Sequence, residues 1–146
     1  MHPLPQREFA RYAAAFATVL LVLGAAWTVR PASGESAIST IRLTIDYGDG
    51  ITKAISNLAW AKGDTVLDAM KTATARPHGI SFSYTGNGAA AVLTRIDDVQ
   101  NEGGGTGKKN WQYWVNDAYG DRSFATFALQ AQDAVVWRFT TEQQGK

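Results

Sequence analysis

The sequence predicts an α+β domain, a β-grasp-like mixed sheet with one covering helix, preceded by one N-terminal transmembrane or signal-anchor helix. Three observations indicate this class. Most of the chain after residue 40 consists of short runs in which apolar and polar residues alternate, as in strands with one buried face. A single helical pattern follows the first two runs, and another strand-like run closes the domain. An uncharged apolar segment precedes all of them.

The amino-terminal segment has the features of a membrane anchor. No residue from Tyr12 to Val29 is charged, and this length, about 18 residues, is the lower limit for a helix that crosses a bilayer. Arg7 and Arg11 precede the run, and such positive charges stay on the cytoplasmic side. We therefore predict a signal anchor over residues 1–30, in a single-pass protein whose amino terminus is cytoplasmic and whose domain is extracytoplasmic.

Two fates of this segment stay open. It remains as an anchor, or it is a signal peptide cleaved after Ala26 or Gly34, where small residues stand at the required offsets, and the domain is then secreted. Residues 31–39 are small and polar and predict a linker. The domain itself is expected over 40–141, followed by a polar tail at 142–146.

Composition excludes several classes of function. The net charge is +1, and a domain without a basic surplus is not typical of nucleic-acid binding. The chain has no cysteine, which excludes disulfides, thiol catalysis and cysteine metal sites. His78 is the one histidine outside the amino-terminal tail, so the domain holds neither a histidine triad nor a multi-histidine metal site. We predict a domain that is not an enzyme and has no metal site.

A hairpin is expected at the start of the domain. Residues 41–47 alternate strictly and predict a strand with one buried face. The apolar residues of that face are Ile41, Leu43, Ile45 and Tyr47. Gly48-Asp49-Gly50 supplies the turn, because glycine accepts positive φ without a clash. The second strand, about 51–58, has no regular alternation, so its register is not fixed.

One helix follows, over about Thr65 to Ala75, with Asp64 expected as its N-cap. Apolar residues recur at helical spacing and form one stripe that can cover a sheet face. They are Val66, Leu67, Ala69, Met70 and Ala73. Pro77 ends the helix.

The remaining strands are predicted at 80–84, 90–96, 111–117 and 134–140. In the second of these, the side chains expected on one face are Val92, Thr94 and Ile96. The Asp97-Asp98 pair after it lacks the spacing of a calcium loop and is expected to be a solvated acidic turn. The stretch from Phe124 to Leu129 is left without an assigned element.

The strand at 111–117 carries aromatic residues on both faces. Trp111, Tyr113 and Val115 share one face, and the other holds Gln112, Trp114 and Asn116. The strand is therefore expected to be covered on both sides or to lie centrally in its sheet. Core packing explains these rings. The alternative is that Trp114 or Tyr113 forms a platform for a flat ligand.

Four stretches resemble one known family, the transcobalamin C-terminal-like domain, a bacterial module similar to the β-rich domain of transcobalamin and intrinsic factor. They are Ile45-Asp46-Tyr47-Gly48, Gly63-Asp64-Thr65-Val66-Leu67-Asp68-Ala69-Met70, Trp111-Gln112-Tyr113-Trp114-Val115-Asn116 and Gln132-Asp133-Ala134-Val135-Val136-Trp137. Asp98 and Asp117 stand where that family usually has glycine. The resemblance implies a β-grasp-like fold and a ligand-binding or surface-display role, with cobalamin or another corrinoid as a possible ligand.

Aromatic residues near an asparagine favour a small-molecule site over a catalytic one. The residues expected to contact the ligand are Trp111, Tyr113, Trp114, Asn116, Tyr119 and Trp137. The glycine-rich segment before the aromatic strand lacks the pattern of a phosphate-binding loop, so it is expected to act as a lid through Gly104, Gly105 and Lys108. The leading hypothesis is a membrane-anchored ligand-binding module. The alternative is an envelope-displayed structural or protein-interaction domain.

Overall fold

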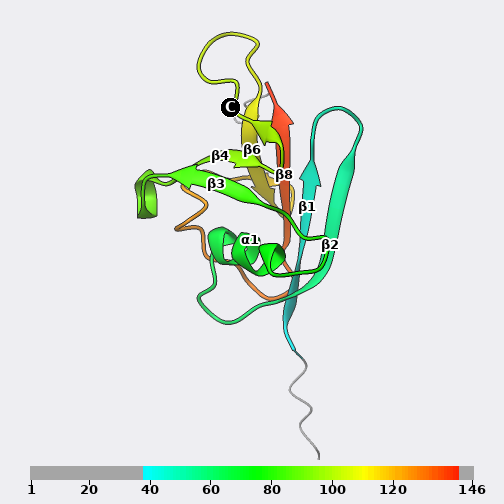
Figure 1. Ribbon diagram of the computed structural model, residues 1–146. Helices are drawn as coiled ribbons and strands as arrows, with labels where there is room; N and C mark the ends of the chain where they lie inside the picture. Colours follow the sequence, from blue (N-terminus) through cyan, green and yellow to red (C-terminus); the bar gives the residue numbers. More distant parts are fainter. Residues whose placement is uncertain (1–37, 142–146) are drawn as a thin grey trace, which may run out of the picture. The chain divides into compact units, whose positions relative to one another are not determined.

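The first and last strands of the domain pair in parallel within a five-stranded mixed sheet (Figure 1). The computed structural model describes residues 38–141, so the predicted anchor, most of the predicted linker and the tail lie outside the described residues. The strands of this sheet, in spatial order, are β2 (Thr52–Ala59), β1 (Thr40–Asp46), β8 (Ala134–Thr140), β6 (Asn110–Val115) and β7 (Ala118–Tyr119). All neighbours except β1 and β8 are antiparallel.

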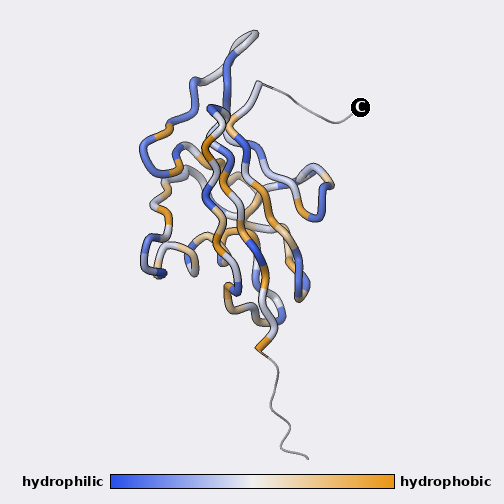
Figure 2. The backbone as a smooth tube through the Cα atoms, turned by 90° about the vertical axis from the view of Figure 1, so that its right-hand side faces the viewer, coloured by the Kyte–Doolittle hydropathy of each residue, from blue (hydrophilic) through white to orange (hydrophobic). Residues whose placement is uncertain are grey.

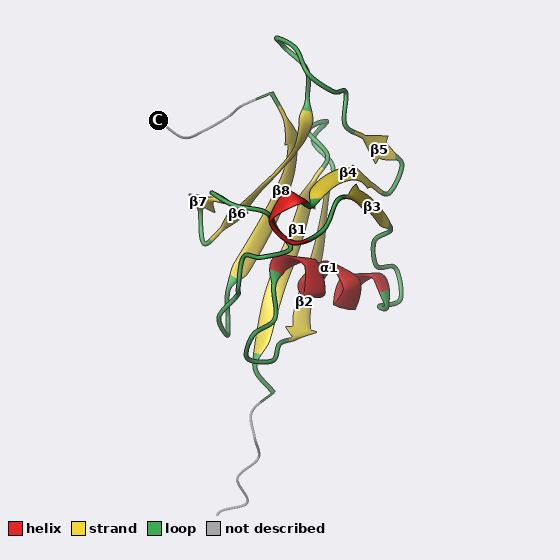
Figure 3. Ribbon diagram, turned by 90° about the vertical axis from the view of Figure 1, so that its left-hand side faces the viewer, coloured by secondary structure: helices red, strands yellow, loops and turns green. Residues whose placement is uncertain are grey.

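A helix and a second, smaller sheet cover one face of the five-stranded sheet (Figure 3). They consist of α1 (Val66–Thr74), β3 (Phe82–Thr85), the short 3-10 helix η1 (Gly88–Ala90), β4 (Val92–Ile96) and β5 (Val99–Gln100). The small sheet is antiparallel, in the order β3-β4-β5. The predicted α+β class with one helix is therefore confirmed for the described residues, and the small sheet is an additional part of the covering layer.

The core lies between the five-stranded sheet and this covering layer. On β1 the predicted face is confirmed, because Ile41, Leu43 and Ile45 are each at most 2% exposed. Trp137 on β8 and Tyr113 on β6 are paired across the sheet and face the same core. Hydrophobic residues follow the strands, whereas hydrophilic residues gather in the loops at their ends (Figure 2).

A β-bulge explains why the alternation in β2 is irregular. Leu58 pairs with Ile41 and Ile55 pairs with Leu43, so Ser56 and Asn57 together oppose one residue of β1. Asn57 has a φ of 55°, a left-handed conformation that asparagine tolerates better than most residues. The extra residue moves Leu58 onto the buried face, where it is fully buried.

The helix begins one residue later than predicted, and its N-cap is Thr65 rather than Asp64. The Thr65 side chain accepts a hydrogen bond from the backbone N–H of Asp68, and the Asp68 carboxylate accepts one from the backbone N–H of Thr65, which together form a capping box. The Asp64 carboxylate instead accepts from the backbone N–H of Ala61 and closes the preceding turn. The predicted apolar stripe is confirmed, since Val66 and Met70 are fully buried.

The predicted faces of the fourth strand are wrong in part. Val92 is exposed, while Leu93 and Ile96 are buried. Tyr84 pairs with Leu93 and Ser83 pairs with Arg95, which leaves one extra residue in β4 and interrupts the period of two.

Asp97 is not the solvated turn residue that the sequence predicts. Its carboxylate accepts hydrogen bonds from the Tyr47 hydroxyl, from the backbone N–H of Ser81 at 2.8 Å and from the Lys53 ammonium at 2.9 Å. Lys53 also donates to the carbonyl of Gly79. Asp97 therefore joins the small sheet to the β1–β2 hairpin by polar contacts at the edge of the core.

This network predicts a loss of stability in acid. Burial acts to raise the pKa of the Asp97 carboxyl, but the hydrogen bonds from Tyr47, Ser81 and Lys53, with the charge of Lys53, lower it below its usual value. A depressed pKa stabilises the fold above the unfolded-state pKa of about 3.9, and that contribution is lost as the pH falls through the lower folded-state pKa. We expect the free energy of unfolding of Asp97→Asn, measured by urea unfolding at a series of pH values, to fall less steeply in acid than that of the parent protein.

The neighbouring carboxylate provides the matched control for this experiment. Asp98 is exposed and accepts no hydrogen bond from the three donors that Asp97 holds. The free energy of unfolding of Asp98→Asn should therefore depend on pH as it does in the parent protein. Equal effects of the two substitutions would contradict the role given to Asp97.

Candidate functional site

The aromatic side chains that face the core from β6 and β8 form one cluster. The rings of Tyr113 and Trp137 lie 5.1 Å apart between centroids, and Phe124 packs edge-on against Trp137 at 5.5 Å. Trp111 continues the cluster toward Phe139, at 5.3 Å. Contacts at these distances and angles are favourable for aromatic pairs. The sheet register places the cluster, because Trp111 pairs with Phe139 and Tyr113 with Trp137.

A cavity of about 160 Å³, here called the aromatic cavity, opens beside this cluster. Its lining comes from the start of β4, from β6 and from the segment after β7. The lining residues are Ala91, Val92, Leu93, Trp111, Gln112, Tyr113, Tyr119, Gly120, Arg122, Ser123, Phe124 and Trp137. Four of the six predicted ligand contacts line it: Trp111, Tyr113, Tyr119 and Trp137.

Two buried polar atoms of the described residues have no hydrogen-bond partner, and both belong to residues that line the aromatic cavity. They are Oε1 of Gln112 and Nε1 of Trp137. One is an acceptor and the other is a donor. The indole N–H of Trp111 differs, because it donates to the carbonyl of Val99 at 2.9 Å. Buried polar groups are normally paired, so these two atoms are unusual for core, and both are buried beside the cavity rather than exposed to it.

A second cavity, here called the loop cavity, lies under the predicted lid and has a volume of about 530 Å³. It shares Gln112 and Tyr119 with the aromatic cavity. Its lining residues are Gly103, Gly104, Gly105, Thr106, Gly107, Lys108, Asn110, Gln112, Tyr119 and Thr141. The structure thus brings all three predicted lid residues to one cavity with Tyr119.

Trp114 lines neither of these cavities. It projects from the face of the sheet opposite the covering layer and is only 4% exposed. The Arg138 guanidinium lies 4.8 Å from the centroid of its ring, and Tyr119 packs edge-on against it at 5.5 Å. Tyr119 itself is 40% exposed. The ring open to solvent on this face is therefore that of Tyr119, which stands on Trp114.

Asn116 also lies outside both cavities, and its amide is engaged within the protein. Its Nδ2 donates to Oδ1 of Asp133 at 2.7 Å, and its Oδ1 accepts from the backbone N–H of Ala134 at 3.0 Å. Asn116 and Asp117, with φ of 49° and 65°, form the two-residue turn between β6 and β7. In this structure Asn116 joins that turn to the start of β8.

The Tyr113 hydroxyl is held as a hydrogen-bond donor. It donates to the carbonyl of Arg122 at 2.7 Å. Burial, with the nearby charge of Asp121, raises the pKa of Tyr113 to about 12. This phenol therefore stays protonated at neutral pH and does not act as a base there.

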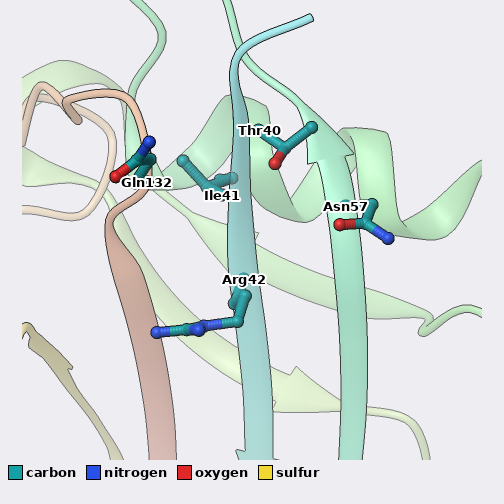
Figure 4. A pocket seen from close by; sticks show the side chains of 5 residues that line it. All are labelled: Thr40, Ile41, Arg42, Asn57 and Gln132. Carbon is teal, nitrogen blue, oxygen red and sulfur yellow. The ribbon is translucent and has the colours of Figure 1, made fainter.

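A third cavity, of about 270 Å³, lies at the start of β1 (Figure 4). It is lined by Thr40, Ile41, Arg42, Asn57 and Gln132. The Arg42 side chain extends toward β8, away from Asn57 (Figure 4). These polar groups do not converge on one point, so the cavity is a weaker candidate than the other two.

Gln112 and Gly120 line the aromatic cavity, although the sequence did not indicate either of them as a ligand contact. Phe124, one of the carboxyl-terminal aromatic residues that the sequence offers as candidate contacts, also lines it. Gln112 was placed on the Trp114 face, and nothing local indicates that its carbonyl oxygen is unpaired. Phe124 lies in the stretch without an assigned element, where it is 2% exposed. Gly120 lies directly against the Tyr113 ring, a contact that only the tertiary structure reveals.

Residues 38–141 contain no group of three or more histidine, cysteine or acidic side chains that could hold a metal ion. In the same part of the chain, no helix is long and apolar enough to cross a membrane.

The fold and these cavities define a small α+β domain in which one helix and a three-stranded sheet cover a five-stranded mixed sheet. The chain belongs to the family described as Domain of unknown function (DUF4430), whose model matches residues 63–141. That match extends from the turn before α1 to the end of β8 and includes every residue of the aromatic cavity. The family description carries no link to transcobalamin. No curated protein matches the chain.

Proposed function

We propose that this chain is a membrane-anchored, extracytoplasmic domain that binds a small molecule and catalyses no reaction. One observation carries the proposal. The Nε1 donor of Trp137 and the Oε1 acceptor of Gln112 are buried without partners, and both residues line the aromatic cavity. Leaving a buried polar group unpaired costs about 1–3 kcal/mol. Neither atom is exposed to the cavity in this structure, so a ligand that supplies an acceptor or a donor recovers that cost once a side-chain rotation brings the atom to the cavity surface.

The lining of the aromatic cavity suits a flat, mostly apolar group. Trp111, Tyr113 and Trp137 provide aromatic surface, and the unpaired polar atoms are few, as in many small-ligand sites. Its volume, about 160 Å³, is below the usual range of about 300–1,000 Å³. The loop cavity, which shares Gln112 and Tyr119, falls within that range. We infer that the ligand places a flat part in the aromatic cavity and extends toward the loop.

The absence of catalysis is proposed from the residues available in the two cavities. No histidine and no carboxylate lines either of them. Acid–base catalysis most often uses a histidine or a carboxylate within hydrogen-bond reach of the substrate, and Tyr113, which lines the aromatic cavity, is held protonated.

The strand order supports a β-grasp assignment. The β1–β2 hairpin, the single helix and the central parallel pair of β1 with β8 follow one another as that fold requires. A β-grasp domain with this aromatic strand resembles the β-rich domain of transcobalamin, so a corrinoid is the first ligand to test. The aromatic cavity is much smaller than a corrin ring system and would accept only one edge of it. The location outside the cytoplasm rests on the uncharged run from Tyr12 to Val29 and on the arginines before it.

Isothermal titration of the full-length chain in a detergent without a sugar headgroup tests the proposal. The probes are cyanocobalamin, cobinamide and a panel of flat heteroaromatic amides. We expect saturable binding of at least one probe at micromolar concentration. Trp137→Phe, which keeps an aromatic ring and removes the unpaired N–H, should weaken binding about tenfold, equivalent to ~1.4 kcal/mol.

Trp60→Phe makes the same chemical change away from both cavities and is the matched control. Its indole N–H donates to the carbonyl of Leu129, so the substitution removes a hydrogen bond without touching the site. Binding should be unchanged in this variant. The proposal fails if no probe saturates, or if the Trp60 and Trp137 variants lose affinity equally.

A protein-interaction role is the second candidate, and the edge of the large sheet favours it. β2 is an edge strand of eight residues without proline, and its one charged side chain, Lys53, is turned to Asp97. Charged side chains and prolines normally protect such an edge from pairing with another strand. In that case the titration above would give no saturable signal. The chain would instead be recovered in complex with a partner protein whose strand pairs with β2.

A further inference from the structure

The loop cavity differs chemically from the aromatic cavity beside it. Four of its ten lining residues are glycines, and the other six carry a hydroxyl, an amide or an ammonium group. The six are Thr106, Lys108, Asn110, Gln112, Tyr119 and Thr141. None is aliphatic and none is acidic. A ligand that fills this cavity gains little from apolar surface and much from uncharged hydrogen bonds.

Tyr119 presents an aromatic ring to this polar cavity. The ring is 40% exposed, although it packs on Trp114 at an interplanar angle of 74°. Arg138 lies over the same indole at 4.8 Å and completes the stack. The pairing of Tyr119 with Trp114 in the β6–β7 hairpin fixes its place along the strand. The ring is thus held in position before any ligand binds, which lowers the ordering cost of binding.

Gln112 supplies a polar partner beside this ring. Its amide nitrogen donates to the carbonyl of Thr140 at 3.3 Å, which fixes the side chain, whereas its Oε1 has no partner. This oxygen is buried in the structure, so it accepts a hydrogen bond from a ligand hydroxyl only after the side chain rotates toward the cavity. The exposed ring of Tyr119 and the side chain of Gln112 therefore line the cavity together with the lid loop.

We propose that the loop cavity binds the ring of a neutral saccharide. The axial C–H groups of a sugar ring carry partial positive charge and pack against the negative face of an aromatic ring such as Tyr119. Its hydroxyls meet donors and acceptors such as the side chains of Lys108 and Thr141, which line the cavity. The inference rests on the proposed binding function and names the ligand class of the loop cavity.

An anion is the competing ligand class for this cavity. Lys108 is its one charged lining residue. The backbone N–H of Gly103 donates to the side chain of Asn110, and that of Lys108 donates to the carbonyl of Gly105, so these amides are engaged within the loop. Binding of a neutral sugar should also be insensitive to salt, because screening acts on charges.

The test is isothermal titration of the full-length chain, in a detergent without a sugar headgroup, with neutral trisaccharides of glucose, N-acetylglucosamine, mannose and galactose. We expect at least one to bind saturably and with the same affinity at low and high salt. Tyr119→Ala should weaken this binding about tenfold, and Tyr119→Phe, which keeps the stacking ring, should change it less than about threefold.

Two further arms separate this inference from the proposed function. Trp137→Phe changes only the aromatic cavity, so it should leave saccharide binding intact while it weakens the flat probes. Inorganic phosphate is the charged competitor. The saccharide assignment is overturned if no trisaccharide binds, if phosphate alone binds, or if Tyr119→Phe loses as much affinity as Tyr119→Ala. If the flat probes still bind in that case, the proposed small-molecule binding function remains supported.

Discussion

Replacing Trp137 with alanine should lower the free energy of unfolding by about 3–5 kcal/mol, the usual cost of deleting a buried tryptophan side chain. Trp137 is 2% exposed and packs against Tyr113 and Phe124, at 5.1 and 5.5 Å between ring centroids. Domains of this size are stable by only about 5–15 kcal/mol, so the variant should unfold at a much lower urea concentration. Urea unfolding followed by far-UV circular dichroism measures the change.

Trp137→Phe provides the contrast. Phenylalanine keeps most of the ring contacts and removes an N–H that has no partner. The small loss of volume destabilises the core, whereas removal of the unpaired donor stabilises it, and we expect the two to cancel to within about 1 kcal/mol. A loss as large as that of Trp137→Ala would mean that the indole N–H is bonded, and the aromatic cavity would then lose its unpaired donor.

Replacing Gly120 with alanine should destabilise the fold by about 1–3 kcal/mol through overpacking. A Cβ at this position would lie 2.1 Å from Cζ of Tyr113 and 2.4 Å from two neighbouring ring carbons. The ring has little freedom to retreat, because the Tyr113 hydroxyl is bonded to the carbonyl of Arg122 and its backbone carbonyl accepts from the N–H of Gly120. Thermal unfolding and ligand titration should both report the change, since a displaced Tyr113 alters the aromatic cavity.

Gly104→Ala is the matched control. A Cβ on Gly104 would meet nothing within 4 Å, and the residue lies in the lid loop. Its substitution should leave the unfolding temperature within about 2 °C of the parent, because surface changes of this kind stay within about 0.5 kcal/mol. Equal destabilisation by the two alanines would show that the Tyr113 contact is not the cause.

Much of the large sheet was predictable from local patterns. β8 has the predicted bounds because it is a short apolar, β-branched and aromatic run, and the buried face of β1 is the predicted one because β1 alternates without interruption. The apolar stripe of α1 was predictable for the same reason, since a helix with one buried face repeats at a fixed period.

The errors occur where one extra residue or one distant partner decides the outcome. The bulges at Asn57 in β2 and within β4 interrupt the alternation of buried and exposed residues. Neither bulge can be recognised from the sequence, because the residues around it do not differ from those of a regular strand or turn. Asp97 looked like a solvated turn, but its partners Tyr47 and Lys53 are 50 and 44 positions away in the sequence. Contacts of that separation cannot be derived from local pattern.

The candidate site was predictable in its parts and not in its arrangement. The aromatic residues and the lid were identified by type, and the structure brings Tyr119 and Gly104 to one cavity. Trp114 and Tyr113 were both candidates for the platform, yet Trp114 is covered by the edge-on contact with Tyr119, its partner in the β6–β7 hairpin. The unpaired atoms of Gln112 and Trp137 result from packing between elements, which no single strand encodes.

The position of β8 determines when this domain can fold. β1 and β2 form one hairpin and β6 and β7 another, and in the sheet the two are joined only through β8, the last strand of residues 38–141. Leu43, for example, pairs with Val135. Until those final residues have been synthesised, the apolar faces of both hairpins lack the strand that unites them, and such long-range pairing is slow. We therefore expect the two hairpins to stay unjoined until β8 has been synthesised, a state that is vulnerable to proteases and aggregation.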